Sequence, residues 1–415
     1  MVVNRAAASG RLRNGPNPPA EGGGESGTRS RSSILLLFAV AAASAGQTAI
    51  LAFLPSLVDD GQVPLSLRAH DFHVASLSAA HPIAALLFAP LWGWLAGRMD
   101  YRVILRAALI VLALALAPVG AVPLPALYLL RVLAGMSAAA IIPLALLSTS
   151  FAGGGRTEQA MHFTWLTAFV FLGDLSGPLL AEVSGVVFPR APLLVVSALV
   201  AVIALLMVFM RLPARGGAGS GGDDRKAPPL ATTSILLLIT VVGGGGLAAL
   251  HVSLLVSRAE GSLTRETIAW MLSLCGLAML AAQLFHTRIS WLVTAPRLLA
   301  CLTLALLAAS LFVFPYGSSM VGIAGLIVAA GWSSASLRLV TSFWISGPAV
   351  LSGWKLGLQH AAASIGQALA PIAIALAEPG KQSLILQGIG WVSILLLVAL
   401  PLVWRLRSDS IKATA

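Results

Sequence analysis

Charged residues are scarce in this chain of 415 residues. Asp, Glu, Lys and Arg together account for 10% of the sequence, whereas soluble globular domains contain roughly 25%. Hydrophobic residues account for 58%, and the mean hydropathy is +0.92. So few charges in so long a chain exclude an ordinary soluble fold, and the composition predicts a polytopic membrane protein.

Cysteine is scarcer still, and the residue clusters that would indicate catalysis are missing from the sequence. Cys275 and Cys301 both lie in apolar segments, which argues against a disulfide framework, and neither has metal-ligand spacing. The run Gly243–Gly246 lacks the Lys-Ser/Thr of a phosphate loop and instead indicates a hinge or a close helix contact. The sequence contains no paired catalytic carboxylates. We therefore expect a protein that is not an enzyme, is not driven by ATP, and has no metal or other cofactor.

Long apolar stretches fill most of the sequence. A helix needs about 20 mostly apolar residues to cross the hydrocarbon core of a bilayer. Twelve segments meet this requirement: 34–58, 74–96, 103–121, 125–149, 163–187, 191–210, 232–256, 266–287, 297–314, 320–345, 356–378 and 383–405. The sequence thus predicts an all-α polytopic membrane protein with twelve transmembrane helices.

The longest interior break divides these segments into two sets of six. Residues 211–231 are rich in Gly and charge, which is typical of a flexible linker. We predict two six-helix bundles, 34–210 and 232–405, joined by this linker. The polar ends, 1–33 and 406–415, are predicted to be cytoplasmic tails, the first of them disordered.

Basic residues are distributed unevenly along the chain, whose net charge is +11. With the N-terminus inside the cell, 19 Lys and Arg fall in cytoplasmic segments and 5 in outer loops. Cytoplasmic loops of membrane proteins carry an excess of Lys and Arg. We therefore expect a multi-pass protein of the cell (inner) membrane with both termini in the cytoplasm. The net positive charge is then explained by the membrane topology, and it also attracts the cytoplasmic face to anionic lipid. We therefore expect no nucleic-acid partner.

The two halves of the sequence repeat one another. Segment 364–375, SIGQALAPIAIA, echoes segment 171–182, FLGDLSGPLLAE, and Gln367 stands where the first segment has Asp174. Many secondary transporters show such weak internal symmetry. The repeat predicts that the two bundles are pseudo-symmetric.

Three motifs lie in or between the second to fifth predicted helices. The first, GWLAGRMDYRVIL, lies between the second and third of these helices. Through Gly93, Arg98 and Arg102, among other positions, it resembles a pattern of the major facilitator superfamily. It departs from that pattern at Gly97, where the family has Asp, and at Asp100, where the family has Gly.

The other two motifs lie on the fourth and fifth predicted helices. LLRVLAGMSAA resembles the fourth-helix pattern through Arg131. GDLSGPLLA resembles the fifth-helix pattern through Gly173, Gly177 and Pro178. The resemblance covers 34–405 and implies the major facilitator fold, with transport of a small molecule by alternating access. The fifth-helix pattern is associated with the family's drug and metabolite:proton antiporters, so it favours proton-coupled export.

Two charged residues lie near the middle of predicted helices. At 1.5 Å per residue, Asp174 is roughly 16 Å from the inner face and Arg131 roughly 9 Å from the outer face. An ionisable residue inside the membrane is a candidate functional site. We predict that Asp174 carries protons and that Arg131 is its partner. The alternatives are a carboxylate that only bonds neighbouring helices and an arginine that extends to the headgroups.

Five other ionisable residues are weaker candidates by the same estimate of depth. Arg338 and His360 are placed near the inner interface, and the outer one holds Glu182, Glu378 and His251. Long side chains at these depths can reach water.

Two further sets of residues are candidates for gating and for lining a cavity. The loop with Gly93, Arg98, Asp100 and Arg102 is either a gate latch or a positive anchor on the cytoplasmic side. Mid-helix side chains are candidates for cavity lining, with interhelical packing as the alternative: Gln47, Gln367, Trp165, Phe169 and Trp332.

Three hypotheses follow from these observations. The first is a monomeric, proton-coupled exporter of a lipophilic or drug-like molecule, which an aromatic cavity would suit. The second is the same fold taking up a small nutrient or metabolite, with protons or passively. The third is a membrane sensor without flux, which the lack of an appended soluble domain disfavours.

Overall fold

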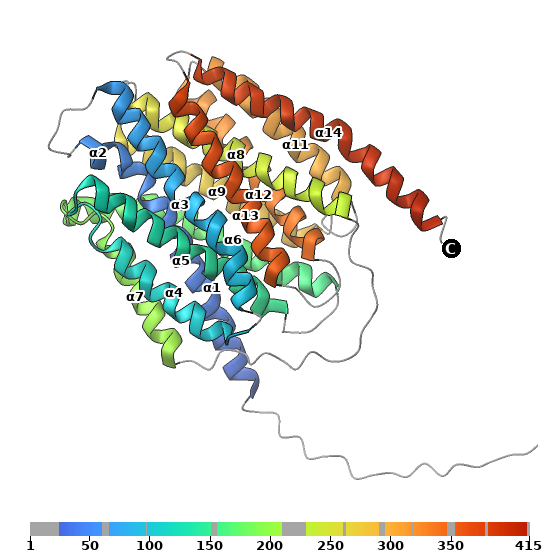
Figure 1. The fold of residues 1–415 in the computed structure, drawn as a ribbon, viewed down its shortest axis with the longest axis horizontal. Helices are drawn as coiled ribbons and strands as arrows, with labels where there is room; N and C mark the ends of the chain where they lie inside the picture. Colours follow the sequence, from blue (N-terminus) through green and yellow to red (C-terminus); the bar gives the residue numbers. More distant parts are fainter. Residues whose placement is uncertain are drawn as a thin grey trace, which may run out of the picture.

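The computed structural model describes residues 25–59, 66–96, 98–150, 156–209, 230–259, 263–289, 295–317, 319–346, 353–377 and 381–412. These residues form helices and no strand, which confirms the predicted all-α class (Figure 1). Each of the twelve predicted segments overlaps a helix. Nine helices among the described residues are long and apolar enough to cross a membrane, and Leu194–Phe209 is apolar but shorter.

The first half consists of helices that run in sequence from blue to green in Figure 1. Their bounds are α1 Glu25–Ala49, η1 Leu51–Phe53, α2 Leu54–Asp59, α3 Leu67–Leu95, α4 Tyr101–Leu116, α5 Leu124–Ser150, α6 Arg156–Val187 and α7 Leu194–Phe209. Together α1, η1 and α2 make up the first predicted span.

The second half runs from yellow to red and lies beside the first. Its bounds are α8 Leu230–Ala259, α9 Arg265–Arg288, α11 Pro296–Val313, η2 Phe314–Tyr316, α12 Met320–Ser346, α13 Gly353–Leu376 and α14 Gln382–Lys412.

The two terminal helices extend beyond the apolar segments that predicted them. Helix α1 begins at Glu25, inside the expected tail 1–33, and α14 continues to Lys412. Hydropathy marks the part of a helix that lipid can surround, whereas the helix itself continues while its backbone hydrogen bonds are made. Residues 1–24 and nearly all of the predicted linker lie outside the described residues, and Leu230 already belongs to α8.

Helix packing repeats between the halves, as the internal sequence repeat predicts. In the first half, α6 packs on α1, α5 packs on α3 and α4, and α7 packs on α4 and α1. In the second half, α13 packs on α8, α12 packs on α9 and α11, and α14 packs on α11 and α8. The main contacts between the halves are α3 with α13 and α6 with α9. Because α3 corresponds to α9 and α6 to α13, these two contacts are also equivalent.

Equivalent glycines allow the closest helix contacts in each half. A Cβ atom on Gly173 of α6 would collide with the carbonyl oxygen of Ala41 in α1. A Cβ atom on Gly366 of α13 would collide with the carbonyl oxygen of Val241 in α8. Small residues permit such approach between membrane helices. In α8, Gly245 lies against Gly366, so the glycine run makes a close helix contact.

Large apolar side chains cover much of the outer surface. Leu114, Val321 and Val398 are exposed by 68%, 83% and 62%. A soluble monomer rarely exposes so much apolar surface, whereas lipid chains solvate it readily. The surface therefore fits a protein embedded in a bilayer.

The contact at Gly366 can be tested with a single methyl group. We expect Gly366→Ala to destabilise the protein by about 1–3 kcal/mol, because the new Cβ overpacks a rigid backbone contact. Gly388→Ala is the matched control, since nothing lies within 4 Å of its added Cβ. Thermal melting of the purified protein should show a lower midpoint for Gly366→Ala alone. Equal midpoints for the two variants would contradict the proposed helix contact.

Candidate functional site

A cavity of about 130 Å³ lies between the two halves. Helices α1, α3, α5 and α6 line it from the first half, and α8, α9, α12 and α13 from the second. Its polar lining is Ser44, Gln47, Thr48, Ser78, His81, Arg131, Asp174, His251, Arg338 and Gln367. A cavity shared by both halves is where a solute can be exposed to either side in turn.

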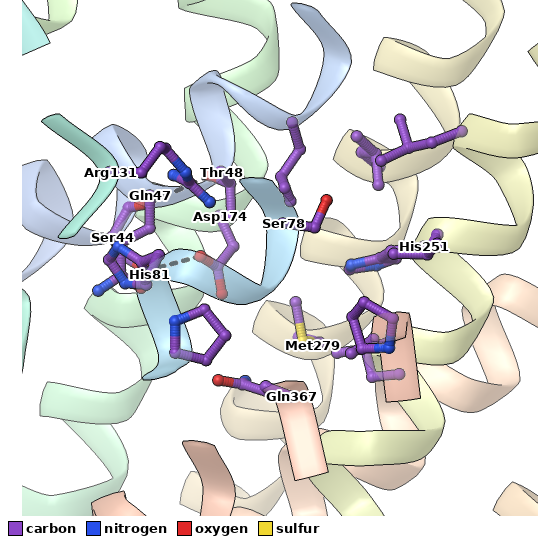
Figure 2. A pocket seen from close by; sticks show the side chains of 18 of the residues that line it. Ser44, Gln47, Thr48, Ser78, His81, Arg131, Asp174, His251, Met279 and Gln367 are labelled. Atoms are coloured by element: carbon purple, nitrogen blue, oxygen red, sulfur yellow. Dashed lines mark hydrogen bonds between the residues drawn. The ribbon is translucent and has the colours of Figure 1, made fainter. Parts of the chain in front are cut away.

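Asp174 projects into this cavity from α6 and is half-buried (Figure 2). The Ser44 hydroxyl on α1 donates a hydrogen bond of 2.6 Å to its Oδ1. Arg338 of α12, which belongs to the other half, lines the same cavity. The carboxylate is therefore hydrogen-bonded within its own half and shares its cavity with a cation from the other.

Arg131 lines the same cavity, and its observed hydrogen bond is to the backbone. Its side chain is buried, and its Nε donates to the carbonyl oxygen of Leu77 at 3.1 Å. The described residues show no ion pair between Arg131 and Asp174. The backbone of α3 fixes Arg131, and Arg338 is the second arginine of the cavity; the described residues show no ion pair between it and Asp174 either.

Arg338 is the main site residue that the sequence placed elsewhere. The depth estimate put it near the inner interface, yet it lines the central cavity. The estimate follows the backbone, whereas an arginine side chain extends several ångströms from it. Arg338 also lines a second, smaller cavity together with Thr167, Ser342 and His360. It is the one residue that lines both of these cavities.

The fifth-helix motif positions Asp174 through packing. Gly173 and Gly177 both lie against α1, the latter beside Ala45 and Thr48. Pro178 lies inside α6. Because these small residues bring the two helices together, Ser44 reaches Asp174. Ser44, Gln47 and Thr48 recur at helical spacing on one face, a pattern that marks α1 as a cavity helix.

The two glutamines line the cavity, but the three predicted aromatic side chains do not. Trp165 is 42% exposed, and Phe169 packs on Phe38 with ring centroids 5.5 Å apart. At about 100° per residue, Trp165 lies roughly 180° and Phe169 roughly 140° around α6 from Asp174.

Trp332 also lies away from the cavity. It packs on Phe285, with ring centroids 5.4 Å apart, and points about 120° away from Arg338 around α12. The expected aromatic wall is thus replaced by polar and aliphatic side chains.

The loop between α3 and α4 makes local contacts. Gly93 is buried in α3, and the Arg98 guanidinium lies 3.8 Å from the ring centroid of Trp94. Asp100 accepts a hydrogen bond from the Arg102 backbone and caps α4. The acid at position 100, where the family pattern has Gly, therefore has a structural role as the cap of α4. Gly97 lies outside the described residues.

An ion pair connects the halves at the other end of the bundle. Arg265, at the start of α9, donates to Glu182 near the end of α6 at 2.7 Å. The Arg265 guanidinium also lies 4.8 Å from the ring centroid of Phe53. We call these three residues the rim latch. The estimated depth of Glu182 along its helix made it a weak candidate. The sequence alone cannot show that the start of α9 lies opposite it.

Two histidines present polar atoms that the protein leaves unbound. His81 Nδ1 and His251 Nε2 are buried and have no hydrogen-bond partner among the described residues. Both side chains line the central cavity (Figure 2). A bound solute or water can satisfy them. Within the same described ranges, no group of three His, Cys, Asp or Glu could hold a metal ion.

Comparisons with known proteins agree with this architecture. Residues 36–341 match the family described as Major Facilitator Superfamily. Among solved structures, the human organic anion transporter MFSD10 (TETRAN) has a TM-score of 0.73 and 16% identity, with 92% of this chain and 100% of that chain covered. At that identity the likeness shows a shared fold. No curated protein sequence matches the chain. Because the family match spans more than half of the chain, the protein belongs to the major facilitator superfamily and is a multi-pass membrane transporter.

Proposed function

We propose that this protein is a secondary active transporter that couples the movement of a small organic molecule to protons. One observation carries the proposal: Asp174 is half-buried in a cavity between the halves that Arg338 of the opposite half also lines. A carboxylate inside a membrane protein is costly and marks ion or proton movement more often than architecture.

Asp174 suits a proton carrier because burial and positive charge act on it in opposite directions. Burial disfavours the ionised carboxylate, whereas a nearby guanidinium favours it. A carboxyl group balanced in this way changes protonation when its surroundings change. Moving one half against the other would alter the distance to Arg338, and so would change how tightly Asp174 holds its proton.

Alternating access follows from the position of the cavity and the rim latch. Glu182 and Arg265 belong to opposite halves, so their ion pair must break if the halves separate at that end. From the distribution of Lys and Arg we assign this end to the outer side, with both termini in the cytoplasm. We further propose that the protein works as a monomer, because each chain contains a complete cavity between its halves.

Two directions of transport remain candidates. Export is favoured by the fifth-helix motif, Gly173, Gly177 and Pro178. Uptake is favoured by the cavity, whose charged and polar lining suits a metabolite better than a neutral lipophilic drug. The human protein of similar fold is described as an organic anion transporter, which supports an organic solute by analogy alone.

The proton role of Asp174 predicts a specific loss of coupling. In proteoliposomes that contain only this protein, we expect a transported solute to change the internal pH. In Asp174→Asn, this pH change should fall at least about tenfold, because the amide cannot take up or release a proton. Binding of the solute should persist, since the amide keeps the size of the carboxyl group.

Asp71→Asn is the control for this variant, because Asp71 is half-buried in α3 but does not line the cavity. We expect it to retain proton movement. Undiminished proton coupling in Asp174→Asn would refute the proton-carrier role, and the absence of flux in the unmodified protein for every solute class would revive the sensor hypothesis.

The rim latch predicts a change in access to the cavity. In a protein without native cysteines, Gln47→Cys should react several-fold faster with an impermeant maleimide when Glu182→Gln is added, because the halves lose a charge-assisted contact. Glu266→Gln is the matched control, because Glu266 is an exposed acid next to Arg265 on α9 and forms no ion pair among the described residues. Equal labelling rates in the three proteins would exclude the gating role.

A further inference from the structure

The charges that line the central cavity are unequal. Arg131 and Arg338 contribute two guanidinium groups, whereas Asp174 contributes one carboxylate. With Asp174 ionised, one positive charge in the cavity lacks a partner of opposite sign. A buried charge is expensive unless it is paired. The group that would complete this cavity is therefore an anion.

The two arginines differ in how much of their hydrogen-bonding capacity is free. Arg131 is fixed by the carbonyl of Leu77. For Arg338, the described part of the chain shows no hydrogen bond from the side chain, although the residue lines the cavity. A guanidinium group offers five N–H donors in a planar fork that matches a carboxylate. Arg338 is thus the better placed of the two to bind an anionic group.

The remaining wall of the cavity indicates the rest of the ligand. Six apolar side chains line it from α8 and α9 in the second half: Leu247, Ala248, Val252, Leu255, Leu272 and Met279. An anion held at Arg338 could place an apolar body against this wall. The unbound nitrogen atoms of His81 and His251 supply additional polar contacts. The lining fits an organic monocarboxylate better than an inorganic ion.

We propose that Arg338 binds the carboxylate group of an organic monoanion and that this anion replaces Asp174 as the counter-charge of Arg338. The proposal rests on the proton-carrier function of Asp174 given above. Once the anion occupies Arg338, the ionised Asp174 loses its stabilising partner and meets a second negative charge. It therefore takes up one proton from water, and this proton forms the O–H bond of the neutral carboxyl group.

This exchange of partners determines whether the proton and the substrate cross the membrane in the same direction or in opposite directions. A cationic substrate would compete with the proton for Asp174 and would drive exchange. A carboxylate at Arg338 instead makes proton binding more favourable, and by linkage the proton makes anion binding more favourable. Proton and anion then cross together in one electroneutral step. Efflux and uptake are both compatible with this stoichiometry, because the anion gradient contributes to the direction.

Other titratable groups face Asp174 or share its cavity. They are Arg338 on α12, Arg131 on α5, Cys275 on α9, His81 on α3 and His251 on α8. Among the residues of α1 whose side chains the structure describes, Ser44 is the one that binds the carboxylate, through its hydroxyl. A pH effect that belongs to Asp174 must therefore vanish in Asp174→Asn and persist in His81→Gln and His251→Gln.

The experiment measures ligand-induced stabilisation of the purified full-length protein at constant ionic strength. The probes are matched for shape: acetate with methylamine, and benzoate with benzylamine. A ligand of the folded state raises the melting temperature according to its dissociation constant. We expect benzoate to stabilise the protein and benzylamine to have no effect. The dissociation constant for benzoate should fall about tenfold from pH 8 to pH 6.

The variants separate binding from structure. Arg338→Gln should abolish stabilisation by carboxylates, whereas Arg288→Gln, on the exposed end of α9, should retain it. Asp174→Asn mimics the protonated acid, so it should bind benzoate more tightly than the unmodified protein at pH 8 and lose the pH dependence. A merely structural role would not produce tighter binding. This second variant keeps the test informative if Arg338→Gln does not fold.

Each alternative outcome has a defined meaning. Failure of both carboxylates to stabilise the protein overturns the proposal, as does weaker benzoate binding in Asp174→Asn at pH 8. If the amines stabilise the protein and this effect is lost in Asp174→Asn, the ligand is a cation and the anion assignment is wrong. The proposal of proton-coupled transport would remain valid in that case. Loss of proton flux by mutation at Asp174 is measured separately, so the anion assignment and the proton role fail independently.

Discussion

The cavity between the two halves is organised around one carboxylate, that of Asp174. Asp174 receives a hydrogen bond from Ser44 on α1 and shares its cavity with Arg338 on α12. Ser44 belongs to the same half of the molecule and Arg338 to the other half. A carboxylate enclosed between two halves changes its surroundings when they move. In the function proposed above, this change couples the proton to the conformational change.

Symmetric packing around the cavity makes this asymmetric chemistry possible. Gly173 and Gly366 occupy equivalent positions and bring α6 onto α1 and α13 onto α8. The repeat thus gives the two halves similar helix packing. Their chemistry differs at one equivalent position, which is Asp174 in the first half and Gln367 in the second. Both side chains line the cavity. A symmetric scaffold with an asymmetric charge allows two related packings in which the carboxylate has different surroundings.

The sequence predicted the helices and the repeat because both leave local signals. Apolar length identifies a span, and small residues beside a proline identify the repeated helix. Asp174, Arg131, Gln47 and Gln367 were found because a polar residue in the middle of a span is unusual. The aromatic residues were misplaced, since depth was considered without the angle around the helix. Trp165 has the expected depth but lies on the opposite face of α6 from Asp174.

Pairing across the halves left no local signal in the sequence. Arg338 lies far from Asp174 in the chain, and the packing of α12 near α6 brings both residues to the same cavity. The same holds for Glu182 and Arg265, whose contact depends on the ends of α6 and α9. Charge counting along single helices could not rank these residues above Arg131, because the balance of charge is a property of the assembled cavity.

Proton uptake during carboxylate binding tests this description most directly. Calorimetric titration of the purified protein with benzoate, in buffers of different ionisation enthalpy, gives the number of protons exchanged per ligand bound. Near neutral pH, we expect about one proton to be taken up for each benzoate bound, and none in Asp174→Asn. Binding without proton uptake, or with proton release, would contradict the exchange of partners between Asp174 and the anion at Arg338.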